Sequence, residues 1–346
     1  MFYLGNFFLM SFFSVFASRE NEKTILYILI FYLTMMIGLR NEVGCDWPAY
    51  LEMFEKSSDL FGDLDLGIYG FLLQREVGFY EINNLFRSLD LEIWAVNILF
   101  TLIFLVGLTK IALTQSRPLL VISLCFPVLI LNMTMSGIRQ SVAIGLICFA
   151  YYYFLRKEVR WFVFYVILAA LFHTSAIIFL AMGFYIKRRG ILPTLVILVV
   201  VLAMIFLIDI YTLQHTKGYV GDEKSEAFGF ISRGAVYLIS PAIYFLFLRR
   251  RLDRNSQEMV LFDIVSILTI LFFVGGFVSS VIGDRFQYYL IPVQVIILVR
   301  SLVCFQQKQL TVFLYSAVYG AYFLIWTSLS SNFRDCYLPY NNFMWS

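Results

Sequence analysis

Long runs of apolar residues dominate the chain, and polar residues gather in the short stretches between them. A helix that crosses a membrane needs roughly 17–25 mostly apolar residues. The runs do not alternate with a period of two, which argues against membrane-spanning strands. The pattern therefore predicts an all-α protein with about ten membrane-spanning helices, at residues 2–17, 25–39, 93–113, 118–132, 137–155, 191–210, 234–248, 259–281, 286–303 and 310–327.

One more apolar stretch, residues 161–186, is interrupted at His173 and has basic clusters at both ends. A single crossing would place one of these clusters outside, against the usual distribution of basic residues. Two arms of about 12 residues would each be too short to cross. We therefore expect a re-entrant hairpin with its tip at His173, and one long tilted helix is the alternative. The hairpin predicts an internal polar cavity, because such a tip must be covered by protein or water.

Composition supports a membrane protein and excludes a soluble enzyme. Hydrophobic residues make up 61% of the chain and charged residues 14%, whereas soluble domains contain about 25% charged residues. The net charge of +3 and the lack of a basic stripe argue against a nucleic-acid partner. No metal site or cofactor is expected, since no cluster of cysteine and histidine has the spacing of zinc ligands.

Basic residues set the predicted orientation, because they gather in cytoplasmic loops. Most of them lie in one set of loops, at 19–23, 110–117, 156–160, 187–189, 249–254 and 300–308. If these loops are cytoplasmic, both termini face outside, as do large loops at 40–91 and 211–233. The first of these loops contains two amphipathic segments, 46–56 and 76–89, that we expect to lie along the membrane interface.

The whole chain, 1–346, is expected to form a single transmembrane domain. Cys45 and Cys336 both fall in outer segments and could pair, although segments this long do not fix their distance.

Arg139 and Gln140 follow a tight outer turn, Ser136-Gly137-Ile138, between two predicted spans. We expect Ser136 to cap the next helix, which places Arg139 in its first turn. A cation there is unfavourable unless an anion joins it, because the N-terminus of a helix already carries positive partial charge. Arg139 therefore indicates an anion site, and a structural arginine is the alternative.

Two further outer segments carry charge at a membrane boundary. The first, 283–289, contains Asp284, Arg285 and Tyr288, which form either a site or a surface ion pair beside interfacial tyrosines. The second, 40–50, offers Arg40 for an anion and Asp46 for a hydroxyl group. Its alternative interpretation is interfacial anchoring by aromatic residues, Tyr50 among them.

Three more polar residues complete the set of candidates. His173 would form a hydrogen bond inside the cavity, or to a carbonyl group if it is structural. Glu76 opens the second amphipathic segment, and Arg233 lies beside the span at 234. A lipid-linked diphosphate suits several outward arginines, because a guanidinium group pairs bidentately with phosphate oxygens.

These motifs resemble, in order, those of the EpsG-type membrane proteins, which belong with the Wzy-type polymerases of O-antigen and capsular polysaccharide. The similar segments are Arg40-x-x-Val-Gly-x-Asp-Trp-x-x-Tyr50, Glu76-Val-Gly-Phe79, Ser136-Gly-Ile-Arg139-Gln140, Phe172-His173-Thr-Ser175-Ala and Asp284-Arg285-Phe followed by Tyr288 or Tyr289. The chain departs from the family pattern at Cys45, where a small or hydroxyl residue is common, and at Trp47, where tyrosine is frequent.

The resemblance implies a GT-C-like glycosyltransferase that uses no nucleotide sugar. It would transfer a growing glycan from undecaprenyl diphosphate to the non-reducing end of a new lipid-linked repeat unit, at the outer face of the bacterial inner membrane. The residues that would bind diphosphate are Arg139, Arg285 and, in support, Arg40. The candidates for the catalytic base are Asp46, Glu76 and His173. The residues that would position substrate are Gln140, Asp284, Tyr50, Tyr288 and Arg233.

Two other functions remain open from the sequence. A ligase that moves finished glycan from the same lipid would use the same arginines, and a flippase or transporter would spread charges through its spans. The expected partners are the lipid-linked donor and acceptor and the membrane lipids. A membrane protein that regulates chain length is also consistent with such a polymerase.

Overall fold

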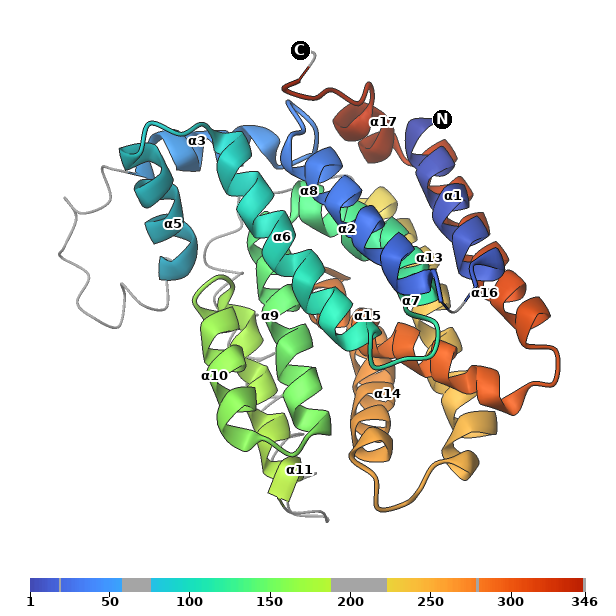
Figure 1. Cartoon of the computed structure of the whole chain (residues 1–346). Coiled ribbons are helices and arrows are strands. Elements are labelled where there is room, and N and C mark those ends of the chain that lie inside the picture. Colours follow the sequence, from blue (N-terminus) through green and yellow to red (C-terminus); the bar gives the residue numbers. More distant parts are fainter. Residues whose placement is uncertain (19, 58–75, 188–222, 278–279, 345–346) are drawn as a thin grey trace.

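The chain is all-helical wherever the structure describes it. The computed structural model describes residues 1–18, 20–57, 76–187, 223–277 and 280–344, and no strand occurs among them. Six helical stretches in these residues are long and apolar enough to cross a membrane, at Ile93–Ala112 (α6), Pro118–Ser136 (α7, η3 and α8), Ile138–Leu155 (α9), Gln257–Gly275 (α14), Gly283–Cys304 (within α15, Ser280–Ser301, and η7, Leu302–Cys304) and Lys308–Leu329 (α16). The protein is therefore a polytopic, multi-pass membrane protein (Figure 1).

The remaining predicted spans meet this description only in part. α1 (Phe2–Phe16) and α2 (Glu22–Gly38) form where predicted, but they have 15 and 17 residues. α13 (Glu223–Ile243) begins before the predicted span at 234, so the end of the predicted loop 211–233 is helical instead. The predicted span at 191–210, the loop residues 211–222 and residues 58–75 of the first loop lie outside the described residues.

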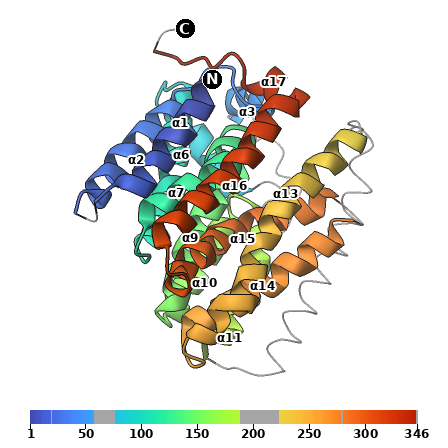
Figure 2. The same cartoon turned by 90° about the vertical axis from the view of Figure 1, so that its right-hand side faces the viewer.

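Two helical stretches form the centre of the bundle. In both Pro118–Ser136 and Gly283–Cys304, 89% of the apolar window is buried inside the protein. α7 (Pro118–Cys125) contacts α1, α2, α6, α15 and α16, which surround it. α14 and α16 lie at the outside, where only 44% of the window is buried (Figure 2). A helix that is apolar on all sides suits the centre, and an outer helix can leave apolar side chains toward lipid.

Glycines allow α6 and α9 to approach closely. A Cβ atom built on Gly107 of α6 would lie 2.0 Å from the carbonyl oxygen of Gly145 in α9. A Cβ atom on Gly145 would lie 2.5 Å from the Cα atom of Phe104. Small residues at helix contacts let backbones pack tightly in membranes, where dispersion between packed atoms drives association. This contact fixes the position of α9, whose first turn carries Arg139.

The stretch at 161–186 folds as a helical hairpin. α10 (Val159–Ala170) ends before His173, and the chain continues as η4 (Thr174–Met182) and α11 (Gly183–Lys187). The two arms contact each other, and α10 also packs along α9. The arms have 12 residues in α10 and 13 in Thr174–Ile186, shorter than a spanning helix. The hairpin and its tip thus have the predicted shape, while its depth in a membrane stays a prediction.

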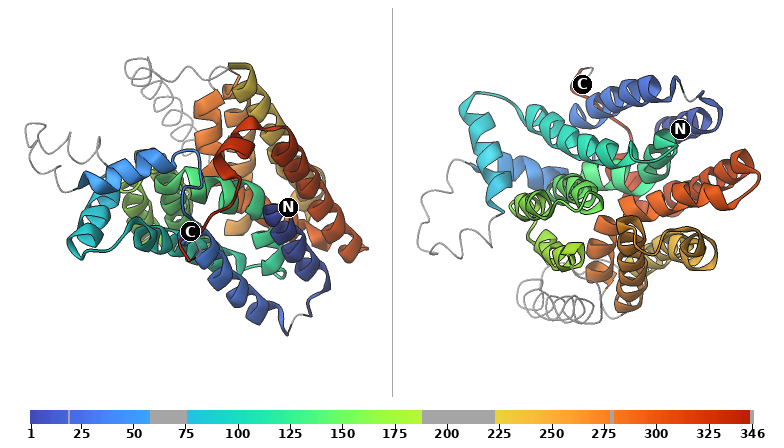
Figure 3. Two further views of the ribbon diagram at one scale, coloured as in Figure 1. Left: turned by 90° about the horizontal axis from the view of Figure 1, so that it is seen from above. Right: turned by 60° about the horizontal axis from the view of Figure 1, so that its bottom comes forward.

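Both chain termini lie at one end of the bundle, with α3 (Trp47–Glu55), α5 (Val77–Ser88) and α17 (Ser331–Tyr337) (Figure 1). Figure 3 (left) looks onto this end. α3 and α5 correspond to the two predicted amphipathic segments.

The C-terminal segment returns to the loop after α2. The Gly44 N–H donates to the Cys336 carbonyl at 2.8 Å, and the Phe343 N–H donates to the Leu39 carbonyl at 2.8 Å. Cys45 and Cys336 form a disulfide across 291 residues of sequence. Gly44 has a φ of +113°, and a Cβ atom there would lie 2.1 Å from the Met135 carbonyl oxygen. Only glycine fits this approach, which holds the loop and the C-terminal segment against α8 (Thr134–Ser136).

Gly107→Leu tests the contact between α6 and α9. We expect it to destabilise the protein by at least about 3 kcal/mol, since overpacking must here displace backbone rather than a side chain. Thermal unfolding in detergent, followed by size-exclusion chromatography, measures the loss. Gly5→Leu is the matched control, because nothing lies within 4 Å of a Cβ atom at Gly5. Equal melting temperatures for the two variants would contradict the close approach.

Candidate active site

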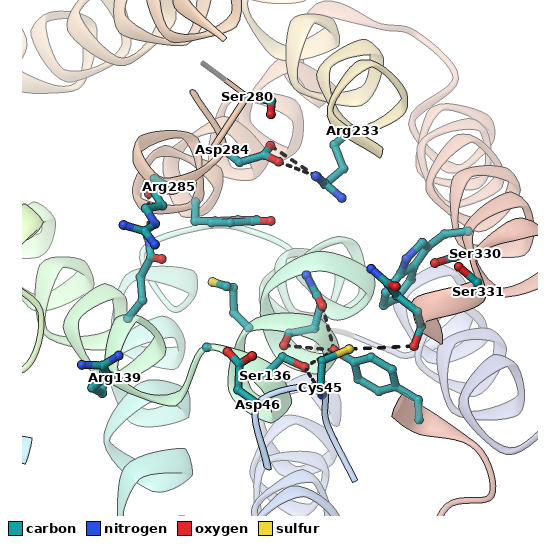
Figure 4. Close-up of a pocket in the computed structure, with 18 of the residues that line it drawn as sticks. Cys45, Asp46, Ser136, Arg139, Arg233, Ser280, Asp284, Arg285, Ser330 and Ser331 are labelled. Carbon is teal, nitrogen blue, oxygen red and sulfur yellow. Dashed lines mark hydrogen bonds and ion pairs between the residues drawn. The ribbon is translucent and has the colours of Figure 1, made fainter. Parts of the chain in front are cut away.

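A cavity of about 560 Å³, lined by many charged and polar residues, lies at the end of the bundle that carries α3 and α17. Its walls combine the ends of long apolar helices with residues of the short helices α3 and α17 (Figure 4). Most of the residues predicted for the site line it, namely Asp46, Tyr50, Arg139, Gln140, His173, Arg233, Asp284, Arg285 and Tyr288. The structure therefore brings together side chains from four of the segments that were singled out in the sequence.

Glu76 lies directly behind the cavity wall and joins two of the lining residues. Its Oε1 atom lies 2.5 Å from Nδ1 of His173, and its Oε2 atom accepts a hydrogen bond from Nη1 of Arg139 at 2.7 Å. The residue is 5% exposed. Burial would raise the pKa of this carboxyl group, but the hydrogen bond and charge of His173 and the charge of Arg139 lower it overall. Glu76 is therefore an anion whose two oxygens are both occupied.

The backbone holds Glu76 in this position. Its φ of 46° lies in the left-handed region, directly before α5. The following turn docks on the hairpin tip, since the Gly78 N–H donates to the Leu171 carbonyl at 2.9 Å. The tip in turn presents His173 to the carboxylate. Because Nδ1 of His173 faces Glu76, Nε2 is the ring nitrogen left for a ligand.

Arg139 lies in the first turn of α9, as predicted, but Ser136 does not cap that helix. The N-cap residue is Gly137, and the Ser136 hydroxyl instead accepts from the Cys45 N–H at 3.0 Å. The predicted cap is wrong because the Ser136 hydroxyl accepts from the backbone of Cys45, which is distant in the sequence. The Arg139 guanidinium group lies 5.9 Å from the centre of the Tyr50 ring. Its Nε atom makes no hydrogen bond within the described residues.

Among the arginines that line the cavity, Arg285 is the one whose charge is not paired with an acidic side chain of the described residues. Its side chain is exposed and forms no ion pair with the described residues. Its backbone carbonyl accepts from Nε2 of Gln140 at 2.5 Å, which ties the start of α15 (Ser280–Ser301) to the start of α9. Arg139 and Arg285 lie on the same side of the cavity (Figure 4). Together they offer a place for an anion with several oxygens.

The alternative of a surface pair between Asp284 and Arg285 is wrong. Asp284 is paired with Arg233 of α13, and both oxygens of its carboxylate accept from that guanidinium group. Successive residues of a helix point in directions about 100° apart, so Asp284 faces Arg233 of α13 while Arg285 points away from this pair. Tyr288, one turn along, is buried against the same pair. This pair positions α13 against α15 and leaves Arg285 free for a ligand.

Asp46 lies between the two sides of the cavity (Figure 4). It precedes α3, but its side chain makes no capping hydrogen bond. Burial raises the pKa of this carboxyl group, and the charges of Arg139 and Arg285 oppose that effect. A carboxylate that has a raised pKa and forms no ion pair with the described residues is suited to accept a proton.

The structure does not bring Arg40 to the cavity. Arg40 is 1% exposed, and its guanidinium group donates to the carbonyls of Val43 at 3.1 Å and Ile37 at 2.7 Å. It also lies over the Trp47 ring, 5.5 Å from the centroid. Its charge stabilises the turn that carries Asp46, so we assign it no role in binding diphosphate.

Sequence reasoning missed one wall of the cavity entirely. Tyr337 donates to Oδ1 of Asn132 at 2.7 Å, and its hydroxyl lies 2.6 Å from that of Ser136. Trp326, Ser330, Ser331 and Asn332 extend this wall along the end of α16 and the start of α17. The one signal in the sequence was Cys336, whose pairing was left open. No group of three or more metal-ligating side chains occurs in the described part of the chain.

The sequence was also compared with known proteins. The model of the EpsG family matches residues 23–342, nearly the whole chain. The chain belongs to the EpsG family. No curated protein and no solved structure matches it. Its family membership suggests a polysaccharide polymerase of the glycosyltransferase kind, in agreement with the resemblance noted in the sequence.

Glu76→Ala tests how the EpsG-family site is held together. The variant leaves Arg139 and His173 without their shared anion, and we expect it to destabilise the protein by roughly 2 kcal/mol. This is less than is typical of a fully buried pair, because the Arg139 side chain is 32% exposed. Thermal unfolding in detergent measures the change. Glu52→Ala is the control, since its carboxylate pairs with Lys56 on the surface and should matter little. Equal effects would contradict the central position of Glu76.

Proposed function

We propose that this EpsG-family protein polymerises lipid-linked oligosaccharide repeat units. In this proposal it moves the growing glycan from undecaprenyl diphosphate to the non-reducing end of a new repeat unit that is itself linked to undecaprenyl diphosphate. The observation that carries the proposal is the cavity in which Arg139 and Arg285 lie on one side and the unengaged carboxylate of Asp46 lies between the two sides. A GT-C-like architecture fits the all-helical fold with its site at one end of the bundle.

The reaction can be written with these groups. The acceptor hydroxyl oxygen attacks the anomeric carbon of the donor glycan, and the bond from that carbon to the diphosphate oxygen breaks. The electron pair leaves with undecaprenyl diphosphate, whose developing charge Arg139 and Arg285 stabilise. The proton of the acceptor hydroxyl passes to Asp46. One glycosidic bond forms, and neither oxidant nor nucleotide is required.

The geometry ranks the three carboxylate and imidazole candidates for the base. Glu76 is a poor base, because both of its oxygens are occupied and its pKa is lowered. His173 lines the cavity with the arginines, and its Nδ1 atom is already engaged by Glu76. Asp46 has a raised pKa and no capping bond. We therefore assign the base to Asp46, and the positioning of Arg139 and His173 to Glu76.

The orientation is part of the proposal. We place the protein in the bacterial inner membrane with the cavity and both termini outside. The termini lie at the cavity end, and the arginine-rich loop between η5 (Tyr244–Leu248) and α14 lies at the other end (Figure 1). The disulfide at the cavity end supports an oxidising compartment on that side. The donor, the acceptor and a regulator of chain length would reach the protein there.

A deletion strain that carries wild type, empty vector or Arg285→Ala tests this function on a gel of its surface glycan. A polymerase predicts core with a single repeat unit in the last two strains and a ladder in the first. Bare core with accumulated lipid-linked polymer would instead show a ligase. Bare core with repeat units trapped on the inner leaflet would show a flippase.

Arg285→Ala should lower the polymerisation rate at least about 100-fold, the usual cost of removing a donor that stabilises an oxyanion. The protein level should not change, since Arg285 has no ion pair to lose within the described residues. Arg285→Lys should restore only part of the rate, because an ammonium group lacks the bidentate geometry of guanidinium. Arg334→Ala on α17, exposed and absent from the cavity lining, is the control. A normal rate in Arg285→Ala would exclude the diphosphate role.

The dependence of kcat/KM on pH tests Asp46. A base must be ionised, so the rate should fall as pH falls through the raised pKa of Asp46, at a higher pH than for an ordinary aspartate near 3.9. Arg285→Ala should move this limb to still higher pH, because the charge of Arg285 lowers the pKa. The Asp46→Asn variant should not show this fall of kcat/KM at low pH. Its rate should be lower than that of wild type by about 100-fold or more. An unchanged limb in Asp46→Asn would assign the base to another residue.

A further inference from the structure

The cavity has two chemically different walls. One, the cationic wall, carries Arg139 and Arg285 at the starts of α9 and α15, with the neutral Gln140 and the hairpin-tip residue His173 beside them. The opposite wall contains Ser330 and Ser331, with Asp46 between the two (Figure 4). This second wall comes from η3 (Phe126–Met133), α16 and α17, and the cavity-lining residues that these elements supply are uncharged.

The uncharged wall offers hydrogen-bonding groups that the protein does not use. The side chains of Ser331 and Asn332 are exposed, and no hydrogen bond from them to another described residue is present. Trp326 is half-buried beside them, and its ring packs 5.1 Å from Phe333 and 5.8 Å from Tyr337 between centroids. A fixed aromatic ring beside neutral amide and hydroxyl groups suits a polyhydroxylated, uncharged ligand, whereas an anion would be drawn to the opposite wall.

The wall is rigidly placed relative to Asp46. Cys45, the neighbour of Asp46, is bonded to Cys336, the neighbour of Tyr337. The Tyr337 hydroxyl is itself held by Asn132 and Ser136. A sugar bound on this wall would therefore present a hydroxyl group to a carboxylate at a fixed distance, which is the requirement for proton transfer.

We infer that Trp326, Ser331 and Asn332 form the binding site for the terminal sugar of the acceptor, an uncharged pyranose at its non-reducing end. The inference rests on the proposed function, because it takes the cationic wall as the place of the donor diphosphate. The sugar lies over the indole ring and forms hydrogen bonds to the Ser331 hydroxyl and the Asn332 amide. Its reacting hydroxyl faces Asp46, and the donor carbon approaches from the arginine side.

Binding without turnover tests this site. The probe is a repeat-unit oligosaccharide freed of its lipid and diphosphate by mild acid, and titration calorimetry measures its affinity for the protein in lipid nanodiscs. We expect the double variant Ser331→Ala/Asn332→Ala to bind about tenfold more weakly, the size expected for two lost neutral hydrogen bonds. Arg285→Ala should bind the probe as wild type does. The control is Asp335→Ala, exposed on α17 and absent from the cavity lining.

Kinetics with lipid-linked substrates give an independent readout. The double variant should raise KM for the acceptor about tenfold and leave kcat and KM for the donor unchanged. A rise in both KM values would assign the wall to the shared polyprenyl chain and overturn the inference. Unchanged probe binding in the double variant would overturn it as well. The wild-type protein could form no polymer while the double variant still loses probe binding. That result would support the sugar site and reject the polymerase function.

Discussion

The carboxylate of Glu76 holds the cationic side of the cavity in place. One buried anion accepts from Arg139 of α9 and faces His173 at the tip of the hairpin. The hairpin tip and the start of α5 also pack together, since the rings of Phe79 and Phe172 are buried on either side of Phe100. The shared charge fixes both against α9, and the left-handed backbone at Glu76 is tolerated because these contacts surround it. The positions of Arg139 and His173 thus depend on an acid that need not touch the substrate.

Several of the charged side chains that line the cavity are already paired with a side chain of opposite charge. Arg233 is paired with Asp284, and Arg139 shares Glu76, whereas Arg285 and Asp46 form no ion pair with described residues. In the proposed reaction, a diphosphate would meet Arg285, which has no ion pair among the described residues, and Arg139, whose charge is partly compensated by Glu76. The negative charge of the diphosphate also favours a protonated Asp46, because like charges nearby raise the pKa of a carboxyl group. Leaving-group stabilisation and proton uptake would then reinforce each other.

Short sequence patterns predicted much of this arrangement. They did not predict which side chains of separate helices pair with one another. Apolar runs located the described helices, and the interrupted stretch with basic residues at both ends indicated the hairpin with its tip at His173. Charged residues at helix ends identified Arg139, Arg285 and Asp46, because charge near lipid is costly wherever it occurs. Which acid pairs with which base depends on side-chain direction across separate helices. For that reason the partners of Arg139 and Asp284, the burial of Arg40 and the hydroxyl network of Ser136 were not foreseen.

The disulfide between Cys45 and Cys336 also carries information about how often the chain crosses the bilayer. Two cysteines can join only on the same side, so the number of crossings between them must be even. The sequence predicts eight spans between these residues apart from the stretch at 161–186. A ninth crossing there would leave the two thiols on opposite sides. The disulfide thus requires an even number of crossings between the two cysteines. This favours a hairpin that enters the membrane and returns to the side from which it came.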